Sequence, residues 1–142
     1  MTYTHSQLEE FVVAALLDPV NRGKPWPPYI STCLACAERG EWENPVATRL
    51  ARAIGRSASN PTQANIATKL SPQDALWLLH PTYKANGLFL ETVEGWAQEL
   101  CVGYKRRRLI ATIHRALFEI KDRPDKQRDT VQKLIEALGE FV

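Results

Sequence analysis

The sequence has 142 residues, of which 44% are hydrophobic and 24% are charged, a balance typical of one globular domain rather than a disordered chain. Its formal net charge of +2 is too small to predict nucleic-acid binding by itself. The longest apolar run, Phe11 to Leu17, is far shorter than the roughly 20 residues of a transmembrane helix, so we expect no membrane span. Three cysteines and an N-terminus without a signal-peptide pattern favour a cytoplasmic protein over a secreted one.

The first expected helix covers residues 6–17, because its apolar residues recur on one helical face: Leu8, Phe11, Val12, Ala15 and Leu16. Ser6 and Glu9 have the spacing of a capping box at its start, and Asp18-Pro19 ends it. A second helix is expected to begin at Pro27 and Pro28, and Gly40 is placed to end it in the left-handed conformation.

Three further helices are expected to begin in one way, with a capping side chain directly before a proline at the first helical position. The pairs are Asn44-Pro45, Asn60-Pro61 and Ser71-Pro72, and they open helices over about 45–54, 61–69 and 72–79. The last helix has Leu76, Trp77 and Leu79 as its apolar residues, and we expect Trp77 to lie in the core.

The remaining sequence predicts a long helix over about 90–121, a turn at 122–124 and a final helix that Gly139 ends. A long helix, a tight turn and a second helix are typical of an antiparallel hairpin. Strand patterns are nearly absent, so the predicted fold class is all-α, with about seven helices. We expect a single domain over 1–142, with core helices at about 6–80 and the long helix and hairpin at about 89–140.

Residues that carry catalysis are not evident in the sequence. Cys33 and Cys36 form one C-x-x-C pair, whereas a structural zinc site usually has two, so we expect both thiols to pack in the interior. His80 and His114 are isolated, and no phosphate-binding loop occurs. We therefore expect a protein that is not an enzyme and that holds no cofactor and no metal.

Basic residues concentrate in the hairpin. Ten basic and four acidic residues lie in 105–133, whereas the rest of the chain is net acidic. This distribution fits either a surface for phosphates or an acidic partner, or helix faces that are simply solvated. Because Lys105 to Arg108 point in nearly every direction around a helix, we expect one of Arg106, Arg107 and Arg108 in a buried or interfacial ion pair.

Residues 47–68 have some features of a helix-turn-helix, in which Arg49, Arg52 and Arg56 would contact DNA. Pro61 and a turn that is longer than usual for this motif disfavour that interpretation. The alternative function is therefore a small DNA-binding protein that uses either this segment or the basic hairpin 105–133.

Two segments resemble the N-terminal domain of the DnaB-type replicative DNA helicases. LEEFVVAALLDP, at 8–19, looks like the opening helix of that domain, and WAQELCVGYKRRRLI, at 96–110, looks like its later helix with a basic Arg-Arg-x-Leu-Ile end. Their order, their spacing and the all-α pattern also agree with that family.

The resemblance implies a non-enzymatic interaction domain of DNA replication, which self-associates through a helical hairpin and contacts a primase or another helicase-like partner. It fits an isolated domain or a small replication protein of a phage or mobile element. We expect the contact surface on the hairpin, at Tyr104, Lys105, Arg106, Arg107, Arg108 and Arg115. Replacing Arg106, Arg107 and Arg108 together by Ala should then weaken association without unfolding the chain.

Overall fold

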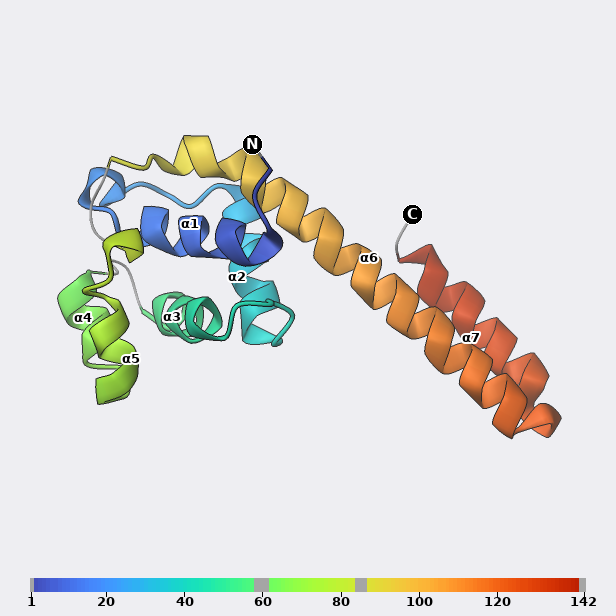
Figure 1. Cartoon of the computed structure of the whole chain (residues 1–142). Helices are drawn as coiled ribbons and strands as arrows, with labels where there is room; N and C mark the ends of the chain where they lie inside the picture. The colour runs from blue at the N-terminus through green and yellow to red at the C-terminus, as the bar shows by residue number, and fades with distance from the viewer. Residues whose placement is uncertain (1, 58–61, 84–86, 141–142) are drawn as a thin grey trace. The chain divides into compact units, whose positions relative to one another are not determined.

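A computed structural model describes residues 2–57, 62–83 and 87–140, and in these ranges the chain is helical with no strand (Figure 1). The all-α prediction is therefore confirmed. The elements are α1 (His5–Leu17), η1 (Pro19–Asn21), α2 (Pro28–Glu38), α3 (Pro45–Gly55), α4 (Gln63–Ala67), α5 (Pro72–Trp77), η2 (Pro81–Tyr83), α6 (Leu90–Asp122), η3 (Pro124–Lys126) and α7 (Gln127–Gly139), where η marks a short 3-10 helix.

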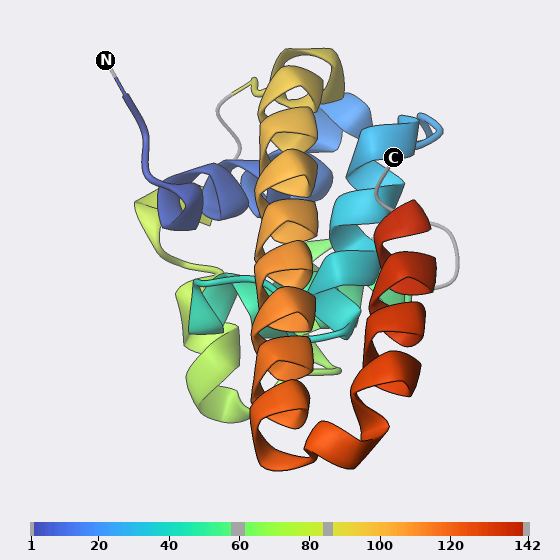
Figure 2. The ribbon, with the colours of Figure 1, turned by 90° about the vertical axis from the view of Figure 1, so that its right-hand side faces the viewer.

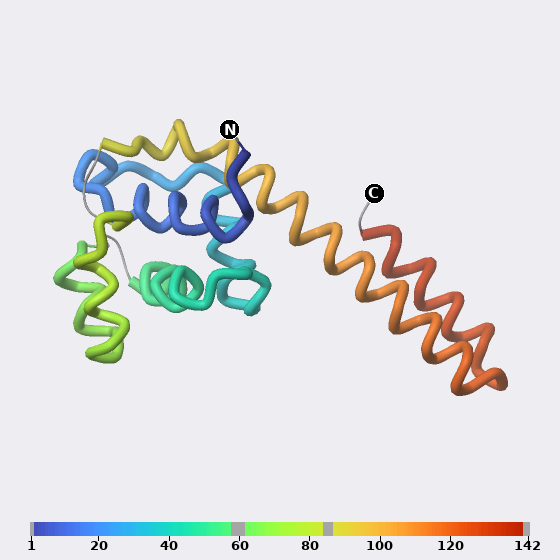
Figure 3. The backbone as a smooth tube through the Cα atoms, viewed as in Figure 1, coloured from blue at the N-terminus to red at the C-terminus, as the bar shows by residue number. Residues whose placement is uncertain are grey.

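The backbone forms two compact units, which we call the N-terminal unit (Met1–Cys101) and the hairpin unit (Val102–Val142). The single domain over 1–142 stays a prediction. The division between the units falls within α6, which Figure 3 shows as one continuous helix, so its first turns belong to the N-terminal unit and its later turns to the hairpin unit.

The start of α1 differs from the expected capping box. Thr4 is the N-cap, its hydroxyl accepts a hydrogen bond from the backbone N–H of Gln7, and the Gln7 side chain accepts one from the backbone N–H of Thr4. Ser6 and Glu9 both lie inside the helix. Glu9 is buried, so its carboxylate is used elsewhere in the fold.

Two of the three expected proline caps are confirmed. The Asn44 side chain accepts from the Ala47 N–H at 3.0 Å, and the Ser71 hydroxyl accepts from the Asp74 N–H at 3.1 Å. Asn60-Pro61 lies outside the described residues. The helix expected there appears as α4, which begins at Gln63 with the Thr62 hydroxyl as its cap.

The core of the N-terminal unit is built from α1, α2, α3 and the first turns of α6. Fully buried aliphatic and small side chains share this interior, and they include Leu8, Val12, Val13, Ile30, Leu50, Ile54, Leu90, Val93, Ala97 and Leu100. At its edge, Tyr3, Phe11 and Trp96 form a three-ring cluster with centroids 5.0 to 5.7 Å apart. The apolar spacing of the sequence therefore predicts most of this core.

The expected burial of α5 is wrong. Leu76, Trp77 and Leu79 are exposed, and Leu78 is the buried residue of this run. Successive residues of a helix point about 100° apart, so turning Leu78 inward directs its two neighbours outward. Because residues 76–79 are all apolar, the sequence does not indicate which of them faces the core.

Polar side chains tie distant segments of the N-terminal unit together. The Glu9 carboxylate on α1 accepts from the Glu43 N–H at 3.0 Å and from the Asn44 N–H at 2.8 Å, at the start of α3. Asp18 accepts from the backbone N–H groups of Gly87 and Leu88, both at 3.0 Å. These four N–H groups are thereby satisfied without water.

We predict that Glu9→Ala destabilises the protein by about 3 kcal/mol, because it removes the charged acceptor of the buried Asn44 N–H and of the part-buried Glu43 N–H. Urea unfolding followed by circular dichroism measures the change in free energy of unfolding. Glu99→Gln on the exposed side of α6 is the control, and its effect should stay within about 0.5 kcal/mol. Equal effects of the two substitutions would contradict the role given to Glu9.

Candidate functional site

The hairpin unit consists of the later turns of α6, the short η3 and α7. Figures 1 and 2 both show α7 running back beside the C-terminal turns of α6. Among the described residues of this unit, only Tyr104, Ala116 and Thr130 are buried. The unit therefore has almost no interior of its own.

Large apolar side chains remain exposed on both helices of this unit. We call them the hairpin apolar set: Ile110, Leu117, Phe118, Val131 and Ile135. Leu117 and Phe118 are 59% and 69% exposed. Ile110 and Leu117 are seven residues apart on α6, and Val131 and Ile135 are four apart on α7, so each pair shares one helix face. Each helix of the unit therefore carries an exposed apolar pair on one face, and exposed apolar faces mark interaction surfaces.

Tyr104 was expected on the contact surface, and the structure corrects this: its side chain is fully buried. It continues the buried positions Ala97 and Leu100 along α6, at the helical spacing of three and four residues. The guanidinium group of Arg107 lies over its ring, 5.1 Å from the centroid. Tyr104 therefore serves as a packing residue that also holds one arginine.

The cationic residues expected at the surface are there. Lys105, Arg106, Arg107, Arg108 and Arg115 are all exposed. We expected one of Arg106, Arg107 and Arg108 in a buried or interfacial ion pair, and the structure rules out the buried form, because all three side chains are exposed. Long cationic side chains keep their charged ends in water all around this turn. The interfacial ion pair stays a prediction.

The arginines of α3 have partners within the N-terminal unit. Arg49 pairs with Asp74 of α5 at 2.8 Å, and Arg52 donates to the Ala37 carbonyl of α2 at 3.1 Å. Arg56 forms an ion pair with Glu38, and its hydrogen bond holds the pKa of that carboxyl below its usual value. These contacts hold α3 against α2 and α5, and the alternative DNA contact at Arg49, Arg52 and Arg56 would have to compete with them.

A second exposed apolar cluster, which sequence reasoning missed, lies on and just after α5. We call Leu76, Trp77 and Leu79 the α5 apolar patch; its two leucines are 65% and 66% exposed. The ring of His80 packs beside that of Trp77, with centroids 5.6 Å apart. The exposure of two leucines here matches that of Leu117 and Phe118 on the hairpin.

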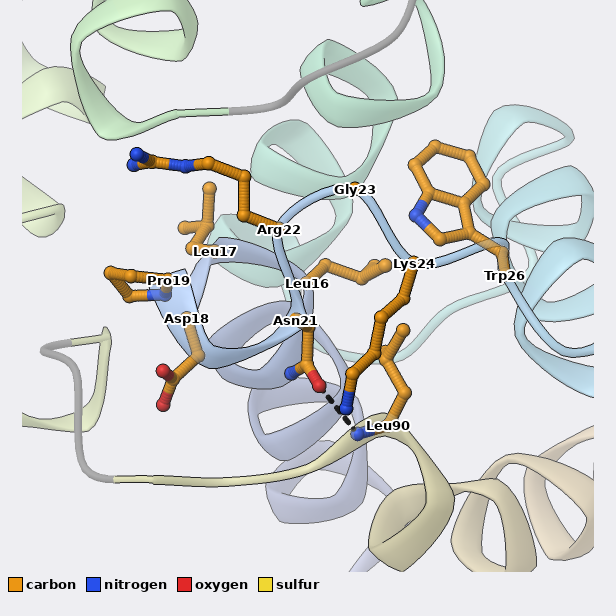
Figure 4. A pocket seen from close by; sticks show the side chains of 10 residues that line it. All are labelled: Leu16, Leu17, Asp18, Pro19, Asn21, Arg22, Gly23, Lys24, Trp26 and Leu90. Carbon is orange, nitrogen blue, oxygen red and sulfur yellow. Dashed lines mark hydrogen bonds between the residues drawn. The ribbon is translucent and has the colours of Figure 1, made fainter.

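The enclosed pocket beside η1 is small. Figure 4 shows it between the 16–26 segment and Leu90, with Asn21 accepting a hydrogen bond from the Leu90 N–H at 3.0 Å. Its volume of about 30 Å³ is room for about one water molecule. Two of the polar side chains around it, Asp18 and Asn21, bond to the backbone and so serve the fold.

Cys33 and Cys36 are buried, as expected from the sequence. The described part of the chain contains no group of three side chains that could hold a metal ion. Within the same ranges, every helix is too short or too polar to cross a bilayer. Among the described residues, the two exposed apolar surfaces and the exposed cations of α6 are candidate contact surfaces.

Comparisons with protein-family models, with curated proteins and with solved structures find no match for this chain.

We predict that Leu117→Gln changes the free energy of unfolding by less than about 0.5 kcal/mol at low protein concentration, because the side chain is already in water. The adjacent Ala116→Gln should cost about 1–3 kcal/mol, because residue 116 is buried and the longer side chain must displace its neighbours. Urea unfolding of the two variants measures both values. A larger loss for Leu117→Gln would show that this residue packs inside the monomer.

Proposed function

We propose that this chain is a non-enzymatic protein-interaction domain of the DNA replication apparatus, which self-associates through the hairpin apolar set and contacts a primase or helicase-like protein. The observation that carries the interaction is the exposure of large apolar side chains on both helices of the hairpin unit. The link to replication rests on the resemblance of residues 8–19 and 96–110 to the N-terminal domain of DnaB-type helicases.

The energetic argument starts from the size of the hairpin unit. A unit of about 40 residues buries too little surface to be stable without help from another body. Among the described residues of this unit only three positions are buried, while Leu117 and Phe118 are more than half exposed. Association of two hairpins would remove these side chains from water on both copies. Each Å² of apolar surface buried in this way stabilises the pair by about 25 cal/mol.

A specific observation also favours the second candidate, a small DNA-binding protein. Lys105, Arg106, Arg107, Arg108 and Arg115 are exposed along α6, where they can reach phosphates. The arginines of α3 already bond to acceptors in their own unit. The DNA-binding alternative is therefore better placed on the basic hairpin 105–133 than on residues 47–68.

The central prediction concerns self-association. The double variant Leu117→Glu with Phe118→Glu should raise the dissociation constant at least tenfold, because it places charges where apolar contact is proposed. Sedimentation-velocity ultracentrifugation over a range of protein concentrations measures this constant. Circular dichroism should show unchanged helix content, since both side chains are exposed in the monomer.

The matched control is Leu76→Glu with Leu79→Glu in the α5 apolar patch. It adds the same two charges at residues of similar exposure, but in the other unit. Association should be unchanged. A chain that is monomeric at all concentrations would overturn the self-association, and equal weakening by both double variants would mean that the effect is not local to the hairpin.

The two candidate functions also predict different behaviour with DNA. The interaction domain should show no binding to labelled single- or double-stranded DNA at about 50 mM salt in fluorescence anisotropy. The DNA-binding candidate predicts binding that falls by orders of magnitude at about 200 mM salt, because each neutralised phosphate releases a counterion. In that case the triple variant Arg106→Ala, Arg107→Ala and Arg108→Ala should lose it. Salt-sensitive binding that this variant loses would make DNA the ligand of the hairpin.

A further inference from the structure

Two cysteines that are far apart in the sequence meet in the N-terminal unit. Cys33 lies on α2 and Cys101 on α6, and their Sγ atoms are 3.4 Å apart although 68 residues separate them. This separation is within the 3–3.5 Å that reacting atoms need for a productive approach. The Cys33 thiol also lies 3.2 Å from the Ala97 carbonyl oxygen, one turn before Cys101 on α6.

The two thiols differ in their access to solvent. Cys33 is completely buried, whereas Cys101 is partly exposed. The hydrogen bond with Cys101 and the burial of Cys33 raise the pKa of the Cys33 thiol far above its usual range. Cys33 is therefore out of reach of reagents in water, and Cys101 is the sulfur of the pair that such a reagent can reach.

We propose that Cys33 and Cys101 form an oxidation site, at which a hydroperoxide converts the two thiols to a disulfide that links α2 to α6. The Cys101 thiolate attacks the peroxide, so an S–O bond forms and the O–O bond breaks. The leaving oxygen takes the proton lost by Cys101, and the products are a sulfenic acid and an alcohol, or water from hydrogen peroxide.

The buried thiol then acts as the resolving group. Cys33 attacks the sulfenic sulfur of Cys101, the S–S bond forms and the S–O bond breaks. The departing hydroxide takes the Cys33 proton and leaves as water, so no charge remains in the interior. In total two thiols lose two electrons and two protons, and the hydroperoxide is reduced.

The third cysteine supplies a matched control. Cys36 is buried one turn after Cys33 on α2, and its sulfur accepts a hydrogen bond from Arg39 at 3.3 Å. The Cys36 sulfur has Arg39 as a hydrogen-bond partner, so the disulfide between Cys33 and Cys101 should form without it. Cys36→Ala removes this thiol while keeping a small side chain in the interior.

The disulfide would fix α6 at its last residue in the N-terminal unit, because Cys101 directly precedes the hairpin unit. It would also close a loop of 68 residues in the unfolded chain. Loops of this length give large entropic stabilisation when cross-linked. We therefore expect the oxidised protein to melt about 5–15 °C above the reduced protein.

The experiment treats the full-length native protein with hydrogen peroxide and then maps its peptides by mass spectrometry without reduction. The expected product is a peptide pair joined through Cys33 and Cys101, with free thiols falling from three to one per chain. Cys36→Ala should give the same cross-link and the same rise in melting temperature. Cys101→Ser should give neither, and dithiothreitol should reverse the change in the wild type.

Several results would overturn the proposal. Cross-links that involve Cys36, or disulfides between two chains, would show that proximity in the native fold does not direct the reaction. Oxidation of Cys101 to sulfinic acid while Cys33 stays a free thiol would show that Cys33 does not resolve the intermediate. Three unreacted thiols would show that the pair is inert.

Discussion

The N-terminal unit depends on the buried carboxylate of Glu9. It accepts hydrogen bonds from the backbone of Glu43 and Asn44, so α1 is fixed against the start of α3. The positive N-terminal end of the α3 dipole also stabilises the negative charge of this carboxylate. Asn44 in turn caps α3 with its own side chain. Without Glu9, the buried N–H of Asn44 and the part-buried N–H of Glu43 would lose this acceptor, and α1 would lose its polar link to the start of α3.

The two units differ in which side chains have found a partner. In the N-terminal unit, Asp18 bonds to the backbone just before α6 and Asn21 to the first residue of α6, and both hold distant segments together. In the described residues, no buried side-chain nitrogen or oxygen lacks a partner. The hairpin unit instead leaves large apolar side chains such as Leu117 and Phe118 in water. These side chains would be stabilised by contact with another apolar surface, and for this reason the proposed self-association involves this unit.

Local signals in the sequence predict the helices well because they act over few residues. Asn44-Pro45 and Ser71-Pro72 mark helix starts that the structure confirms. The long helix was expected over 90–121 and is observed as Leu90–Asp122. Choices that depend on packing were harder: Leu78 is buried in place of Trp77, and Glu9 serves the α3 backbone rather than its own helix. The approach of Cys33 and Cys101 is set by the tertiary fold, and no spacing rule reveals it.

The position of the cations relative to the hairpin apolar set gives the two candidate functions opposite responses to salt. Arg106 lies one turn before Ile110 on the same side of α6, so cations border the apolar residues. In a twofold pair of hairpins both surfaces carry the net positive charge of residues 105–133, so the two copies repel each other. Added salt screens this repulsion, so self-association should strengthen as salt rises. Phosphate binding by the same arginines weakens with salt. The sign of the salt dependence therefore distinguishes which chemistry the hairpin surface uses.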